Sequence, residues 1–135
     1  MQVMPEETLL AFDYGILKLG VAIGNTVLRQ SSPLEIIHDE TRDARFGRIE
    51  QLIQAWQPQR LVVGLALDKD GGEQEAPARC RRFARQLHGR FGLPVELVDE
   101  RGSSMEAQEF VGNAPDDAHA AAIILQRYLD AHPER

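Results

Sequence analysis

Residues 9–24 read LLAFDYGILKLGVAIG, in which two apolar runs are separated by a junction that begins at Asp13, Tyr14 and Gly15. Short apolar runs of this kind favour β-strands, and a glycine between them favours a turn. The stretch therefore predicts a β-hairpin with strands over 9–14 and 20–24. The first strand ends in an acidic side chain, so the hairpin also carries the first candidate for chemistry.

The rest of the chain reads as alternating helices and strands. Residues 34–38 (LEIIH), opened by Pro33, predict a third strand, and residues 61–67 (LVVGLAL) predict a strand that is covered on both faces. Helical spacing of apolar residues predicts helices over 43–56, from 75 or 76 to 91, and over 116–131, with a fifth strand at 95–98 and a short helix from 103 or 104 to about 111. We expect Trp56 in the core, and we expect the last helix to be lined by Ala120, Ile123, Ile124, Arg127 and Tyr128.

This order predicts an α/β fold. A meander of strands followed by alternating helices and strands indicates a mixed five-stranded sheet flanked by helices on both faces. A length of 135 residues predicts a single domain over 1–135.

Bulk composition limits the setting. A single cysteine, Cys80, without a basic leader segment or a long apolar run, predicts a reducing, cytoplasmic location and no membrane partner. The net charge of −6 argues against a uniformly basic nucleic-acid binder. Residues 79–90 (RCRRFARQLHGR) nevertheless contain five arginines and no acid, and this local basic stripe is more informative than the total.

Three acidic residues follow or open predicted elements. Asp13 ends the first strand, Glu100 follows the fifth strand, and Asp117 opens the last helix. Ligands of open α/β sheets gather at the carboxyl ends of strands, so these acids are expected to converge there. Clustered carboxylates are neutralised by hard divalent ions, and Mg²⁺ or Mn²⁺ held in this way can support cleavage of phosphodiester bonds.

Each acid also has an ordinary structural interpretation. Asp13 can serve turn chemistry, Asp117 can cap a helix, and Glu100 can form a surface ion pair with Arg101. Only their combination favours a catalytic metal site.

Basic residues and a glycine supply candidates for binding phosphates. Arg79, Arg82 and Arg85 share roughly one helix face and are expected to line the approach of a nucleic acid. Lys18 and Arg101 are expected to contact phosphate oxygens near the carboxylates. Gly15 permits close approach of the backbone to a phosphate. The candidate nucleic-acid-binding residues are therefore Gly15, Lys18, Arg79, Arg82, Arg85 and Arg101. The alternative is a solvated basic face with surface ion pairs.

Four segments together resemble the YqgF or RuvX family of Holliday-junction-resolvase-like proteins, which are assigned as pre-16S rRNA nucleases. The segments are FDYGILKLGVAIGN, LVVGLALDKDGGEQ, RFARQLHGRFGLPVELVDER and DDAHAAAIILQRYL. The resemblance implies a ribonuclease-H-like fold and a three-carboxylate site of Asp13, Glu100 and Asp117. It also implies trimming of the 5′ end of the 16S rRNA precursor during ribosome assembly, with ribosome assembly intermediates as partners.

The sequence departs from the family pattern in places. The segment between Ser104 and Asp117 is shorter than usual, and Pro115 stands where the family usually has lysine. These departures bear on substrate choice and rate more than on the fold or the metal site.

Three other functions compete with this interpretation. The first is a non-catalytic nucleic-acid or ribosome-associated module, which the negative charge favours. The second is a Holliday-junction resolvase acting on branched DNA, which would need a dimer, whereas the sequence is compatible with a monomer or a weak homodimer. The third is ATP binding, because residues 13–25 resemble the first phosphate loop of sugar kinases and actin-like ATPases. Those proteins need two lobes to enclose ATP, and 135 residues supply one.

Overall fold

The structure is a computed structural model that describes residues 6–15, 18–38, 41–65, 75–99 and 117–132. The predicted short helix at 103–111 and the two predicted site residues Glu100 and Arg101 lie outside the described residues.

The described residues form a mixed five-stranded sheet, as predicted. Its strands are β1 (Thr8–Tyr14), β2 (Leu19–Asn25), β3 (Gln30–Ile37), β4 (Arg60–Leu65) and β5 (Val95–Asp99), arranged in the order β3-β2-β1-β4-β5. The strands β1, β2 and β3 form an antiparallel meander, whereas β4 and β5 run parallel to β1. The strands β1, β4 and β5 therefore all begin at one end of the sheet and finish at the other. We call the end where these three strands begin the amino edge, and the end where they finish the carboxyl edge.

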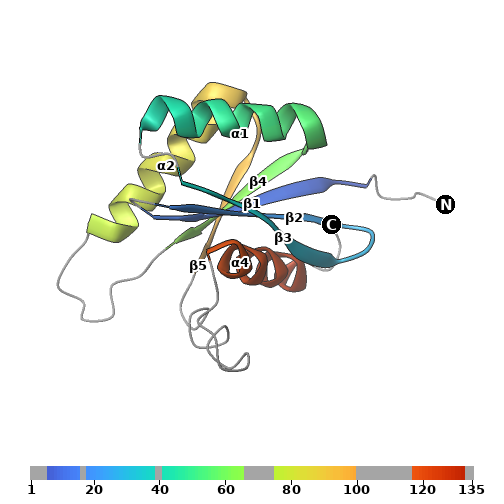
Figure 1. Cartoon of the computed structure of the whole chain (residues 1–135). Coiled ribbons are helices and arrows are strands. Elements are labelled where there is room, and N and C mark those ends of the chain that lie inside the picture. Colours follow the sequence, from blue (N-terminus) through green and yellow to red (C-terminus); the bar gives the residue numbers. More distant parts are fainter. Residues whose placement is uncertain (1–5, 16–17, 39–40, 66–74, 100–116, 133–135) are drawn as a thin grey trace.

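Helices cover both faces of this sheet (Figure 1). Helices α1 (Arg42–Trp56) and α2 (Glu75–Phe91) lie on one face, and α4 (Asp117–Ala131) lies on the other. Strand β1 alternates between the two, since Leu10 and Phe12 belong to the core under α1 and α2 while Leu9 and Ala11 belong to the core under α4. Because side chains alternate along a strand, Asp13 is on the α4 face and Tyr14 is on the other.

Small residues on β2 allow α4 to approach the sheet closely. Gly20, Ala22 and Gly24 alternate with the buried Leu19 and Val21, so they form the α4 side of the strand. A Cβ atom at Gly24 would lie 2.8 Å from Leu125 Cδ2. The helix is held along its length, because Ser31 Oγ donates to the Ala122 carbonyl at 2.6 Å and the Arg29 guanidinium donates to the Leu129 carbonyl.

The third strand begins earlier than predicted. It starts at Gln30 and includes Pro33, which was expected to open the strand. Pro33 is tolerated because β3 is an edge strand, where a missing N–H need not break a ladder bond, and it pairs beside an irregularity at Val21/Ala22.

Two predictions about packing are wrong. Trp56 is 46% exposed, because it occupies the last turn of α1, before Gln57 takes a left-handed conformation and ends the helix. The predicted lining of α4 is wrong for Ala120, Ile123 and Arg127, which are only half-buried. The prediction is confirmed for Ile124 and Tyr128, which are buried together with the unpredicted Ala121, Leu125 and Leu129.

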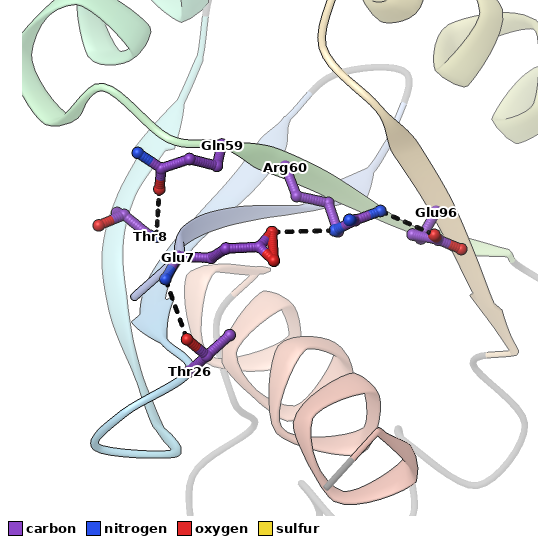
Figure 2. Close-up of polar contacts among 6 residues, drawn as sticks. All are labelled: Glu7, Thr8, Thr26, Gln59, Arg60 and Glu96. Carbon is purple, nitrogen blue, oxygen red and sulfur yellow. Dashed lines mark hydrogen bonds and ion pairs between the residues drawn. The ribbon is translucent and has the colours of Figure 1, made fainter. Parts of the chain in front are cut away.

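Charged groups at the amino edge form pairs (Figure 2). Arg60 at the start of β4 donates from Nε to Glu7 Oε1 at 3.2 Å and from Nη1 to Glu96 Oε1 at 3.0 Å. Backbone N–H groups of Glu7 and Thr8 donate to side chains of Thr26 and Gln59, at 2.9 Å and 2.6 Å. Arg60 therefore connects the beginnings of three neighbouring strands.

Within the described ranges, no helix is long and apolar enough to cross a membrane. Cys80 is buried in the core under α1 and α2.

Candidate functional site

The carboxyl edge brings together the ends of three parallel strands. Strand β1 ends at Tyr14, β4 ends at Leu65, and Leu65 is in register with Asp99 at the end of β5. Glu100 is the next residue in the sequence after Asp99, although its structure is not described. Of the three predicted acids, Asp13 and Asp117 are therefore the two that the structure describes.

Gly20 places these two aspartates close together. Asp13 on β1 is directly opposite Gly20 on β2, and residues so paired in antiparallel strands have Cα atoms about 4.5–5.5 Å apart. A Cβ atom at Gly20 would lie 1.9 Å from the carbonyl oxygen of Asp117, so the first residue of α4 rests on the strand at this position. Asp13 and Asp117 are thus neighbours on the α4 face, and both are half-buried.

The start of α4 adds a favourable electrostatic environment. Asp117 is an acid in the first turn of a 15-residue helix, where the helix dipole stabilises negative charge. Hard divalent ions prefer carboxylate oxygens, so the donor chemistry of Asp13 and Asp117 suits Mg²⁺ or Mn²⁺. Among the described residues no group of three or more such ligands is present, and the third predicted carboxylate, Glu100, is not among them.

Gly15 and Lys18 lie in the connection between β1 and β2 at this edge. A Cβ atom at Gly15 would lie 2.6 Å from the Lys18 carbonyl oxygen, so the tightness of the hairpin itself explains a glycine there. The Lys18 side chain is exposed. The Gly15 carbonyl accepts a hydrogen bond of 2.7 Å from Arg45 Nη1, which connects this turn to helix α1.

Two of the three predicted arginines of α2 line a surface hollow, and the third does not. All three lie on the face opposite Asp13 and Asp117, because α2 and α4 cover different sides of the sheet. Arg79 and Arg82 line a surface hollow beside Tyr14, whereas the exposed Arg85 is not among its lining residues. Arg79, Arg82 and Arg85 are therefore on the other face of the sheet from Asp13 and Asp117.

Sequence reasoning missed several residues of this edge. Gly20 supports Asp117, while Tyr14, Arg42 and Arg45 line the hollow together with the arginines of α2. Two signals were available in the sequence. The spacing Gly-x-Ala-x-Gly from Gly20 indicates a strand face open to close packing, and two arginines in the first four residues of a helix contravene the usual preference for acids there.

Residues 7–131 match the model of the RuvX family, described as Holliday junction resolvase. This chain belongs to the RuvX family. A protein of Bordetella petrii is 74% identical over 131 residues, covering 96% of this chain and 100% of that protein, and bears the name "Putative pre-16S rRNA nuclease". A protein of Burkholderia mallei with the same name is 48% identical over 134 residues, covering 96% of this chain and 92% of that protein. The family resemblance seen in the sequence is thereby confirmed.

A solved structure supports the fold of this RuvX-family chain. The RuvC protein of T. thermophilus, in complex with a Holliday junction substrate, aligns with a TM-score of 0.60 at 16% identity, covering 93% of this chain and 95% of that chain. Resolvases of this kind have a ribonuclease-H-like fold, so the predicted fold is confirmed.

Proposed function

We propose that this RuvX-family chain is a metal-dependent nuclease that hydrolyses phosphodiester bonds, and that it processes the 5′ end of pre-16S rRNA during ribosome biogenesis in the cytoplasm. The observation that carries this proposal is the placement of Asp13 and Asp117 on either side of Gly20 at the carboxyl edge. Membership of a resolvase family and the names of the two relatives support the reaction class and the substrate. The proposal treats residues 1–135 as one catalytic domain.

Asp13, Glu100 and Asp117 are the proposed ligands of Mg²⁺ or Mn²⁺. Glu100 is included because the family resemblance implies it as the third carboxylate, and it directly follows Asp99 in the sequence. When bound, such ions neutralise charge on phosphate oxygens and make water a stronger nucleophile. Asp13, Glu100 and Asp117 would hold these ions where the scissile phosphate binds, and the α4 N-terminus would favour the negative charge of the phosphate.

Nearby basic groups are proposed to hold the nucleic-acid backbone. Lys18 is exposed at the same edge, and Gly15 in the same turn is proposed to permit close approach of a phosphate to the backbone. Arg101 is proposed to act beside Glu100, and Arg79, Arg82 and Arg85 are proposed to contact the strand farther from the acids. The proposed partners are the rRNA precursor and ribosome assembly intermediates.

Holliday-junction cleavage is a second candidate. The description of the matching family and the junction bound to the T. thermophilus relative favour it. This reaction would require two sites presented by a dimer, so the oligomeric state separates the two candidates.

The test compares two aspartates of one helix. Wild type, Asp117→Asn and Asp130→Asn are incubated with a labelled RNA spanning the 5′ end of the 16S precursor and with a branched DNA junction, each in Mn²⁺, Mg²⁺ and EDTA. Asp130 is an exposed residue near the other end of α4. We expect metal-dependent RNA cleavage that Asp117→Asn abolishes and Asp130→Asn retains.

The other outcomes identify the alternatives. Preferential cutting of the junction by a dimer would replace rRNA processing with resolvase activity. No cutting of either substrate by the folded wild-type protein, with assembly intermediates supplied, would indicate a non-catalytic binding module.

A further inference from the structure

A hollow of about 210 Å³ opens on the face of the sheet opposite the acids. Its positive charge comes from two helices, with Arg42 and Arg45 on α1 and Arg79 and Arg82 on α2. Tyr14 and Phe83 contribute aromatic wall. We call this site the arginine hollow, defined by Arg42, Arg45, Arg79, Arg82, Tyr14 and Phe83.

The inner part of the hollow is built rather than incidental. Arg45 is only 6% exposed, and its guanidinium donates to the Gly15 carbonyl at 2.7 Å and lies 5.7 Å from the centre of the Tyr14 ring. The Tyr14 ring in turn lies 5.0 Å from the Phe83 ring, which is buried. These contacts fix one guanidinium at the sheet edge and hold the aromatic wall in place.

The charges of the hollow favour an anion. Four guanidinium groups gather there, and no carboxylate occurs among the described residues that line it. Arg42 and Arg45 also occupy the first turn of α1, where the helix dipole adds positive potential and Asp43 is the one acid. A phosphate carries the charge opposite to that of these side chains, so the hollow has the side-chain chemistry of a phosphate site.

The shape and chemistry indicate which anion. Planar guanidinium groups bind phosphate oxygens in a bidentate manner, and they are common where phosphate must be recognised. The volume exceeds that of a single water molecule, about 30 Å³, several times over, so it accommodates a phosphate with part of its nucleoside. Tyr14 is half-buried, which leaves part of its ring available to a sugar or base.

The hollow is adjacent to the proposed catalytic edge. Tyr14 directly follows Asp13, and the two side chains lie on opposite faces of β1. A strand that crosses the carboxyl edge next to these residues would therefore meet the acids on one face and the arginines on the other.

We propose that the arginine hollow binds a phosphate group of a single nucleic-acid strand whose neighbouring part lies against the acids across the sheet edge. The inference rests on the proposed function only for the identity of that strand as substrate, because binding in the hollow requires neither metal nor cleavage. The phosphate is either internal to the strand or at its 5′ terminus, and the experiment separates these sources.

The test measures binding in EDTA, where metal-dependent cleavage is silent. Fluorescence anisotropy is recorded with one short single-stranded RNA carrying either a 5′-monophosphate or a 5′-hydroxyl, on wild type, Arg82→Gln and Arg81→Gln. Arg81 is the matched control, since it is an exposed arginine on the same helix that is not among the lining residues. Melting temperatures verify that each variant is folded.

We expect Arg82→Gln to weaken binding about fivefold or more and to reduce the slope of log Kd against log salt by about 0.7, the value of one phosphate contact on a single strand. Arg81→Gln should change neither quantity appreciably. Loss confined to the 5′-monophosphate RNA identifies a terminal phosphate, and equal loss on both RNAs identifies an internal phosphate. Either result supports the hollow.

Equal weakening by Arg82→Gln and Arg81→Gln would overturn the proposal, because it would indicate only general charge attraction. Unchanged binding in Arg82→Gln and in Arg42→Gln would also overturn it. The experiment separates this inference from the nuclease proposal, since it is read in EDTA without cleavage. Binding that depends on Arg82, together with no cleavage by wild type in Mn²⁺, would overturn the nuclease proposal and support the hollow.

Discussion

Charged side chains form acid–base pairs at one end of the sheet, whereas at the other end charges of the same sign lie together on each face. At the amino edge, Arg60 lies between Glu7 and Glu96, and acid and base neutralise each other across three strands (Figure 2). At the carboxyl edge, Asp13 and Asp117 gather on the α4 face, while the arginine hollow occupies the other face. Strand β1 runs from one arrangement to the other.

This difference indicates what each edge is for. Opposite charges paired within the protein stabilise the fold and leave little potential for ligands. Like charges gathered on one face oppose folding, and their retention is typical of sites that are completed by a ligand of opposite charge. On this view, the proposed function of the acids is to bind cations, and that of the arginine hollow is to bind phosphate.

The largest effect is expected from neutralising one acid at the carboxyl edge. Because even indirect partners of a metal ligand affect activity 10–100-fold, Asp13→Asn should lower metal-dependent RNA cleavage at least about a hundredfold. Its melting temperature, measured beside that of wild type, verifies that the variant is folded. Glu7→Gln is the control, because Glu7 is an acid at the amino edge that pairs with Arg60. It should reduce thermal stability slightly and leave cleavage unchanged. Similar activity loss in both variants would remove the distinction between the two edges.

A second prediction concerns the support beneath Asp117. In Gly20→Ala the new methyl group would meet the Asp117 carbonyl, which is backbone and cannot simply rotate away. We expect the free energy of unfolding to drop by about 1–3 kcal/mol, as for other overpacked sites, and cleavage to fall because α4 shifts relative to Asp13. Gly47→Ala is the matched control. A Cβ there meets nothing within 4 Å, so the change should stabilise helix α1 by about 0.5–1 kcal/mol.

Urea unfolding and RNA cleavage of both glycine variants measure these effects. Full stability and full activity in Gly20→Ala would contradict the close approach of α4 to β2.

The smallest effect is expected at the amino edge itself. Arg60→Met removes the shared partner of Glu7 and Glu96, and it should lower the free energy of unfolding by about 1 kcal/mol after allowance for solvent screening. Cleavage should be unchanged, because the site lies at the opposite end of the strands. A double-mutant cycle with Glu96→Gln in urea should show coupling between the two residues, and zero coupling would mean that the pair contributes nothing.

The fold followed from local patterns where those patterns are unambiguous. The hairpin at 9–24 and the strand at 61–67, described in the structure as β4 (Arg60–Leu65), were predicted from their apolar runs, and α2 was predicted from its apolar face. Prediction was wrong at Pro33, because its tolerance depends on β3 lying at an edge of the sheet. It was wrong for Trp56 because helical spacing cannot show where a helix runs past its core. The lining of α4 was misjudged since apolar residues surround much of that helix.

The site was only partly accessible from the sequence. Asp13 and Asp117 were singled out by their positions at the ends of elements, and the structure brings them together through Gly20. Periodicity within α2 selected Arg79 and Arg82 but also Arg85, which lies outside the hollow. The contribution of Arg42 and Arg45 depends on α1 and α2 meeting over Tyr14, a tertiary contact that no local pattern specifies.

The most direct test of the account is calorimetric titration of Mn²⁺ into wild type, Asp13→Asn, Asp117→Asn and Glu96→Gln. Glu96 is an acid on the α4 side of β5 at the amino edge, paired with Arg60, so it is the matched control. The account predicts Mn²⁺ binding to wild type and Glu96→Gln, with affinity at least about tenfold weaker in both aspartate variants. Equal Mn²⁺ affinity in all four proteins would contradict a metal site at the carboxyl edge.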